Sequence, residues 1–186
     1  MTRNRSRSLV LRTFMALTPA LLVTGVAIGL VGGGRASEAS AGAVPSAPPS
    51  PACLTDDLDG TVTGRPGSGP REAVLTLTNT SGHACEIRGW ADVALVTPPG
   101  DVVRVPTRKV GAEGPAIVLE PGATARSGLQ WDTCTAGRAG CGVGVAFQFI
   151  ADRESTGVAA DVAELPEADG DGITVKVLRI SPLQAA

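Results

Sequence analysis

Apolar and polar residues alternate along most of the chain from residue 53 onward, the pattern of β-strands that bury one face. The alternation is clearest over residues 71–79 (REAVLTLTN), where one face carries Ala73, Leu75 and Leu77. This segment is therefore predicted to be a strand with those three side chains in the core.

Two later segments are also predicted strands. Residues 142–150 (GVGVAFQFI) are apolar almost throughout, which predicts a central strand. Residues 157–165 (GVAADVAEL) form the one stretch that could instead be a helical turn. The alternation in residues 173–180 (ITVKVLRI) predicts three inward side chains, those of Ile173, Val175 and Val177.

Glycine and proline divide the domain into short pieces, since the chain has 24 Gly and 14 Pro. Pro98-Pro99-Gly100 predicts a hairpin-like connection and Pro121-Gly122 a tight turn. Short strands joined by such turns predict an all-β, antiparallel β-sandwich and disfavour an α/β enzyme. The other expected strands lie within residues 58–64, 85–90, 92–97, 101–107 and 114–131.

Residues 1–41 have a different character. Residues 1–12 carry four arginines and no acidic residue, and residues 13–34 contain no charged residue. A basic head followed by an apolar run predicts an export signal, and the small residues 39–41 would allow cleavage before Gly42. The apolar run also reaches the roughly 20 residues that span a bilayer, so an uncleaved membrane-anchor helix remains the alternative.

Residues 42–52 are rich in Ala, Ser and Pro and are predicted to be a disordered linker, whereas residues 53–186 form the folded domain. From Glu38 onward the chain holds all 18 acidic residues but only 11 of the 16 basic ones, a net charge of −7. Nucleic-acid binding needs basic patches, so it is not expected here. Membrane contact is expected only through the N-terminal segment, and the sequence does not determine the oligomeric state.

The four cysteines all follow the predicted export signal. Their even number predicts two disulfides in an oxidising compartment, with three possible pairings. Cys134 and Cys141 flank a short glycine-containing loop, which favours a local bridge and leaves Cys53 to pair with Cys85. The chain has no C-x-x-C motif and one histidine, so neither a zinc site nor a redox pair is expected, and no cofactor is predicted.

No catalytic constellation stands out. The single histidine, His83, lies in a predicted turn beside a cysteine, and there is no G-x-S-x-G motif. Two carboxylates could in principle hydrolyse glycosides, but the domain has few of the aromatic side chains on which sugars stack. The sequence therefore favours a non-enzymatic domain over a secreted carboxylate-dependent hydrolase.

Residues 167–172 (EADGDG) form a weak calcium candidate. Glu167, Asp169 and Asp171 have the spacing that opens a calcium-binding loop. The twelfth position is Leu178, where such a loop needs a bidentate glutamate. Since aspartate also favours tight turns, no metal site is assigned.

Three other features have a structural interpretation. Asn79 opens an Asn-Thr-Ser pattern that is a glycosylation acceptor in some secreted proteins. Trp90 and Trp131 are expected in the core and not as exposed anchors for a partner. The local basic cluster is expected at a solvated hairpin edge; it consists of Arg104, Arg108 and Lys109.

The chain resembles a bacterial secreted family catalogued as domain of unknown function 4232. The resemblance rests on an opening cysteine, a strand that ends in Asn-x-Ser-Gly-x-x-Cys, and a later Leu-x-Pro-Gly turn. Ile87 stands where the family has leucine, and the family's second cysteine pair is expected to lie farther apart than in this chain. The matching residues are Cys53, Asn79, Ser81, Gly82, Cys85, Gly89, Pro121 and Gly122.

The resemblance implies an immunoglobulin-like sandwich and no assigned activity. Together with the predicted export signal, it leads us to expect a non-catalytic binding or structural domain at the cell envelope or outside the cell. The binding site and the partner are not identified by the sequence. A second alternative, besides the hydrolase, is an anchored accessory subunit of an envelope complex, which requires residues 13–34 to stay attached.

Overall fold

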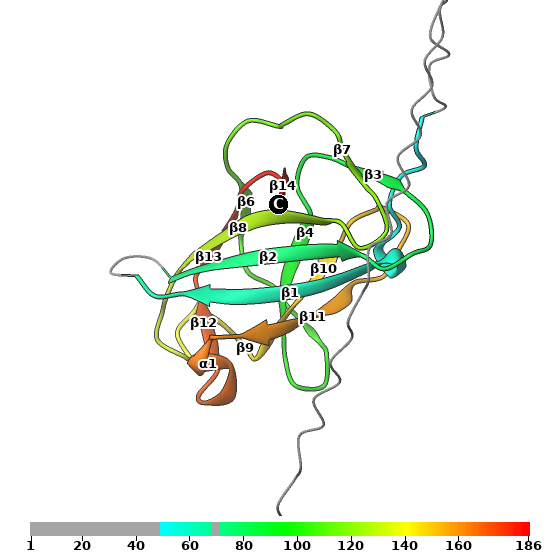
Figure 1. Cartoon of the computed structure of the whole chain (residues 1–186). Helices are drawn as coiled ribbons and strands as arrows, with labels where there is room; N and C mark the ends of the chain where they lie inside the picture. Colours follow the sequence, from blue (N-terminus) through cyan, green and yellow to red (C-terminus); the bar gives the residue numbers. More distant parts are fainter. Residues whose placement is uncertain (1–48, 68–70) are drawn as a thin grey trace, which may run out of the picture. The chain divides into compact units, whose positions relative to one another are not determined.

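The computed structural model describes residues 49–67 and 71–186 (Figure 1). The predicted signal or anchor at residues 1–41 and most of the predicted linker lie outside these residues. The described part is almost entirely β-structure, with one 3-10 turn, η1 (Thr55–Asp57), and one four-residue helix, α1 (Pro166–Asp169). Its strands are β1 (Leu58–Arg65), β2 (Arg71–Asn79), β3 (Cys85–Ile87), β4 (Asp92–Val96), β5 (Val102–Val103), β6 (Thr107–Lys109), β7 (Ile117–Leu119), β8 (Thr124–Asp132), β9 (Gly142–Gly144), β10 (Ala146–Ile150), β11 (Val158–Ala163), β12 (Ile173–Val175), β13 (Val177–Ile180) and β14 (Gln184–Ala185).

Ten strands form one hydrogen-bonded sheet. Its order is β5-β4-β10-β11-β1-β2-β8-β13-β6, and the short β14 also pairs with β8. The long strands β1, β2 and β8 run antiparallel at its centre (Figure 1). Two small sheets, β3-β7 and β9-β12, complete the described domain.

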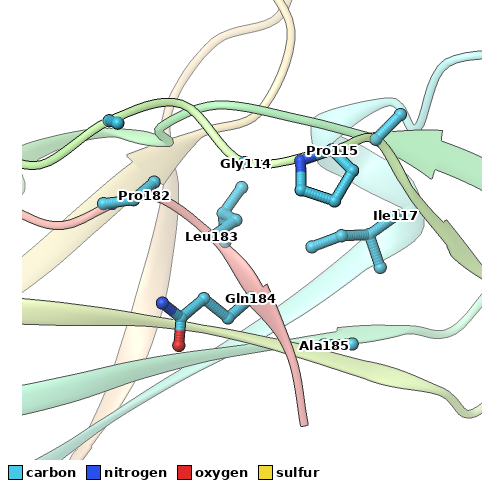
Figure 2. A pocket seen from close by; sticks show the side chains of 9 residues that line it. Gly114, Pro115, Ile117, Pro182, Leu183, Gln184 and Ala185 are labelled. Carbon is cyan, nitrogen blue, oxygen red and sulfur yellow. The ribbon is translucent and has the colours of Figure 1, made fainter.

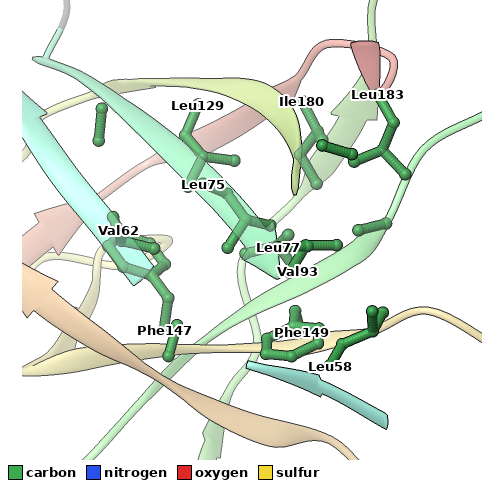
Figure 3. Close-up of a cluster of buried hydrophobic side chains, with 14 of the residues drawn as sticks. Leu58, Val62, Leu75, Leu77, Val93, Leu129, Phe147, Phe149, Ile180 and Leu183 are labelled. Carbon is green, nitrogen blue, oxygen red and sulfur yellow. The ribbon is translucent and has the colours of Figure 1, made fainter. Parts of the chain in front are cut away.

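The large sheet curls around its own apolar face. The rings of Trp131 on β8 and Phe147 on β10 have centroids 5.7 Å apart. In the sheet these strands are separated by β11, β1 and β2, so in a flat sheet they would lie about 19 Å apart. The contact requires the two halves of the sheet to face each other across the core, where Leu75, Leu129 and Phe149 are buried (Figure 3).

The structure confirms the all-β class but corrects the expected pairing. Two pairs of strands are parallel, β1 with β11 and β13 with β6. β11 pairs with β10 on one side and with β1 on the other, so neither β10 nor β1 is an edge strand. The sheet therefore continues from one half of the domain to the other. The immunoglobulin-like sandwich of two separate antiparallel sheets is therefore not confirmed.

Two predicted strands are interrupted where the chain changes partner. Residues 142–150 break at Val145, whose N–H donates to the carbonyl of Val96, and β10 then lies between β4 and β11, as expected for a central strand. Residues 173–180 break at Lys176, whose N–H donates to the carbonyl of Asp132. The break shifts the alternation, so the expected inward position of Val177 is wrong: it is half-buried, whereas Leu178 and Ile180 are buried.

The ambiguous segment 157–165 contains strand β11 and not a helical turn. Its Val158 and Ala160 pair with β10 while Asp161–Ala163 pair with β1, so hydrogen bonding on both sides determines its conformation. Local sequence did not reveal this, because one of the two partners, β1, is distant along the chain.

Both expected disulfides are present. Cys53–Cys85 is buried and ties the start of the domain to β3, while Cys134–Cys141 closes an exposed loop after β8. The backbone also pairs just before Cys53, since the Pro51 carbonyl accepts from Glu86 N–H and Ala52 forms a bridge with Glu86. Ordered pairing therefore begins within the last two residues of the predicted linker.

Candidate functional site

Two of the residues that carry the family resemblance, Ser81 and Gly122, hydrogen-bond to a third, the buried Asn79. Its Nδ2 donates to the carbonyls of His83 (2.9 Å) and Leu119 (2.8 Å). Its Oδ1 accepts from the N–H (2.9 Å) and hydroxyl (2.7 Å) of Ser81. All four side-chain hydrogen-bonding positions of Asn79 are thus used at a residue with 0% exposure.

The backbone of Asn79 joins the same arrangement to the Pro121-Gly122 turn. Its N–H donates to the carbonyl of Ala123, and its carbonyl accepts from Gly122 N–H. Gly122 has φ of 80°, a conformation that favours glycine, and the turn closes through Ala123 N–H to the Glu120 carbonyl. The Asn79 cluster therefore holds two loops at one end of the sheet and has a structural role. Because both Nδ2 hydrogens are engaged and buried, Asn79 cannot accept a glycan in the folded protein.

The calcium candidate has a different arrangement in the structure. Glu167 lies in α1 and pairs with Arg71 at 2.7 Å, while Asp171 is exposed and precedes Gly172, whose φ is 93°. Among the described residues, no group of three or more His, Cys, Asp or Glu side chains is placed to hold a metal ion.

The remaining sequence candidates are His83, the two tryptophans and the basic cluster. His83 is exposed in the turn held by Asn79. Trp131 is buried as expected, while Trp90 is half-buried and donates to the Val110 carbonyl at 3.2 Å. The basic cluster is exposed along β6 and the residues before it, and Lys109 pairs there with Asp92 at 3.0 Å.

A polar cluster that the sequence did not reveal surrounds Asp152. One carboxylate oxygen accepts from the N–H and hydroxyl of Thr55 (2.7 and 2.8 Å) and from the Ser155 hydroxyl (2.6 Å). The other accepts from the N–H groups of Glu154 and Ser155. These hydrogen bonds, first that of the Ser155 hydroxyl and then those of Thr55, hold the pKa of Asp152 well below its usual range. The cluster fastens η1 to the loop after β10.

The candidate binding site is an apolar groove between two extended segments (Figure 2). One wall is the chain leading into β7, and the other is the chain leading into β14. The hollow has a volume of about 370 Å³, within the usual range for ligand sites. It is lined by Ala112, Gly114, Pro115, Ala116, Ile117, Pro182, Leu183, Gln184 and Ala185.

The groove carries no ionisable side chain among its lining residues. Figure 2 shows Ile117 and Pro115 on one side, with Leu183 and Ala185 on the other. Leu183 is buried and anchors its wall to the core, whereas Ala116 and Ala185 are exposed. The arrangement can hold an uncharged ligand by excluding water from apolar surface, and it offers no acid, base or nucleophile.

Sequence analysis missed this groove. The sequence predicts strands within residues 114–131 and assigns no role to residues 112–113 or 182–185. The usable signal was a pair of proline-containing stretches with small side chains, of which the first also contains Glu113, but only the fold shows that they face each other. Within the described part of the chain, no helix is long and apolar enough to cross a membrane.

A family model described as "Domain of unknown function (DUF4232)" matches residues 53–184 of the chain. The match covers the described domain from its first disulfide to the first residue of β14. It includes the groove wall at residues 112–117 and residues 182–184 of the other wall, and it ends one residue before Ala185. Comparison with curated proteins and with solved structures gives no match.

Replacing Asn79 should destabilise the domain strongly. Asn79→Ala leaves the Leu119 carbonyl and the Ser81 N–H without their partner, so we expect the free energy of unfolding to fall by about 3 kcal/mol. Thr80→Ala, at the adjacent exposed position, is the control and should cost less than about 1 kcal/mol. Urea unfolding measures both, and equal losses would show that the amide has no special role.

Asp152 should stabilise the domain in a pH-dependent way. Its folded pKa lies below the unfolded value of about 3.9, so its contribution is complete above roughly pH 5 and is lost as pH falls below about 4. Asp152→Asn should lower the free energy of unfolding by about 1–3 kcal/mol at pH 7, and the difference from wild type should shrink between pH 4 and 2. Exposed Asp161→Asn is the control, and a pH-independent difference for Asp152→Asn would refute this account.

Proposed function

Because the chain belongs to the DUF4232 family, whose description assigns no activity, we propose its function from its own surface. It is a non-catalytic binding domain that works outside the cytoplasm and takes an apolar ligand in the groove between residues 112–117 and 182–185. The observation that carries the proposal is the groove itself, which is open, apolar and free of ionisable lining side chains.

The burial of apolar surface supplies the binding energy in this proposal. Each Å² of apolar surface removed from water contributes about 25 cal/mol, before the cost of immobilising the ligand. Ile117 and Pro115 offer apolar surface from one wall, and Ala185 from the other. Leu183, fixed in the core, keeps the second wall in place without a ligand, which reduces the ordering cost of binding.

The absence of charge from the groove lining supports binding over hydrolysis. A carboxylate-dependent glycosidase needs two carboxyl groups about 5–9.5 Å apart across one cleft. The nine residues that line this groove include no Asp or Glu. The hydrolase alternative would therefore need a different cleft.

Two observations support a location outside the cytoplasm. The described domain has two disulfides and no free cysteine, which suits an oxidising compartment. The sequence before it has the basic head and apolar run of an export signal. In this proposal the chain is either released after cleavage before Gly42 or held by residues 13–34 as an anchored accessory subunit.

The test begins with the protein recovered separately from the medium and from membranes of cells that express the full chain. We expect it outside the cytoplasm, with an intact mass four hydrogens lighter than after reduction, because two disulfides are formed. The membrane fraction should retain residues 13–34 only if the anchored alternative holds. Protein confined to the cytoplasm with free thiols would refute the proposed location.

The recovered protein is then titrated with a small uncharged apolar dye, N-phenyl-1-naphthylamine, and followed by NMR. Amide shifts should concentrate in residues 112–117 and 182–185, and Ala185→Asp should weaken binding at least tenfold by placing a charge in the groove. The control Val102→Asp changes a residue that is 52% exposed on the edge strand β5 and should leave the affinity unchanged. Shifts located elsewhere, or no binding, would refute the groove as the site.

A further inference from the structure

We propose that the natural occupant of the groove is an extended peptide segment of a partner protein, which adds as a strand to the free edge of β14. This inference rests on the proposed function and names its ligand class. It follows from the backbone groups at the groove, which an apolar small molecule would leave without partners.

The free edge of β14 can be located from its pairing with β8. Gln184 lies opposite Arg126, and Ala186 N–H donates to the Thr124 carbonyl at 3.2 Å. In an antiparallel pair, alternate residues direct their N–H and C=O groups to the same neighbour. Gln184 and Ala186 therefore point to β8, whereas Leu183 and Ala185 direct their backbone groups to the opposite edge.

That opposite edge is already paired at one end. Leu183 N–H donates to the carbonyl of Gly89 at 2.7 Å, so the loop before β4 supplies the first bond that an added strand would make. Beyond this bond, the N–H and carbonyl of Ala185 make no backbone hydrogen bond to another described residue, whereas the Leu183 carbonyl lies against Gly114 of the other wall. The two backbone groups of Ala185 define a short template for an extended chain.

The opposite wall is similar in character. Residues 112–116 belong to no strand, and their backbone makes no backbone hydrogen bond within the described part of the chain. This wall approaches β14 closely at Gly114, where an added Cβ would lie 3.9 Å from the Leu183 carbonyl oxygen. The narrow point marks one end of the site, and Ile117 lies farther along the wall (Figure 2).

The backbone groups and the uncharged side chains that line the groove indicate what kind of peptide would bind. Covering the edge with an apolar molecule would remove the Ala185 N–H and carbonyl from water at a cost of about 1–3 kcal/mol each, whereas a peptide strand would pair them. A charged ligand side chain inside the groove would have no partner of opposite charge among the lining residues. The segment should therefore have small or branched apolar side chains facing Ile117 and Leu183, and no charge at those positions.

The test selects such a peptide and then removes its backbone donors. Phage-displayed random heptapeptides are selected on the full-length, disulfide-bonded protein and counter-selected on the bare support, so that the Ala185→Asp variant is kept for the affinity measurements. The best peptide is synthesised with single N-methyl groups at successive positions, and affinities are measured by calorimetry. Val102→Asp is the control protein, because its substitution lies at a different sheet edge.

Strand addition predicts an alternating result. N-methylation should weaken binding about tenfold or more where the N–H faces β14, and much less at the neighbouring positions. Ala185→Asp should abolish binding and Val102→Asp should retain it, while the Ala185 amide proton should shift as it gains a carbonyl partner.

Five other outcomes would overturn the inference. Uniform insensitivity to N-methylation would mean that side chains alone bind, and unchanged affinity for Ala185→Asp would place the peptide elsewhere. A concentration-dependent dimer that Ala185→Asp disrupts would make a second copy of the chain the occupant. If the apolar dye binds in the groove but no peptide is selected, strand addition fails while the proposed function stands. If neither binds there, both fail.

Discussion

The rest of the structure depends on one end of the domain, and the side-chain amide of Asn79 holds this end together. It links the turn after β2 to the end of β7, and its backbone links both to the turn that opens β8. The Cys53–Cys85 bridge lies beside it and fastens the start of the domain to β3. These signature residues therefore have a structural role, and another of them, Gly89, accepts from the Leu183 N–H at the edge of the groove between β7 and β14.

The curl of the large sheet explains why the groove exists. The contact between Trp131 and Phe147 folds the sheet around one core, and the small β3-β7 sheet covers part of that core. Between β7 and β14 the covering is incomplete, because residues 112–116 form no ladder. A curled sheet that leaves one short edge unpaired offers an apolar surface and backbone hydrogen-bonding groups at the same place.

Local sequence predicted what depends on local chemistry. The alternation at Ala73, Leu75 and Leu77 and the Pro121-Gly122 turn were correct, as was the cysteine pairing. It did not predict the parallel pairing of β11 with β1, since that depends on partners 100 residues away. The phase shift at Lys176 and the groove were missed for the same reason: each is produced by segments that meet only in the folded domain.

Hydrogen exchange of the free protein, followed residue by residue by NMR, tests most directly whether the Asn79 cluster is stable and the groove-facing edge of β14 is unpaired. We predict that the Asn79 backbone N–H exchanges only through global unfolding, because it is bonded to the Ala123 carbonyl within a buried cluster. The Ala185 N–H should exchange far faster than the Gln184 N–H, which faces β8. Rapid exchange at Asn79, or protection of Ala185 equal to that of Gln184, would contradict the account.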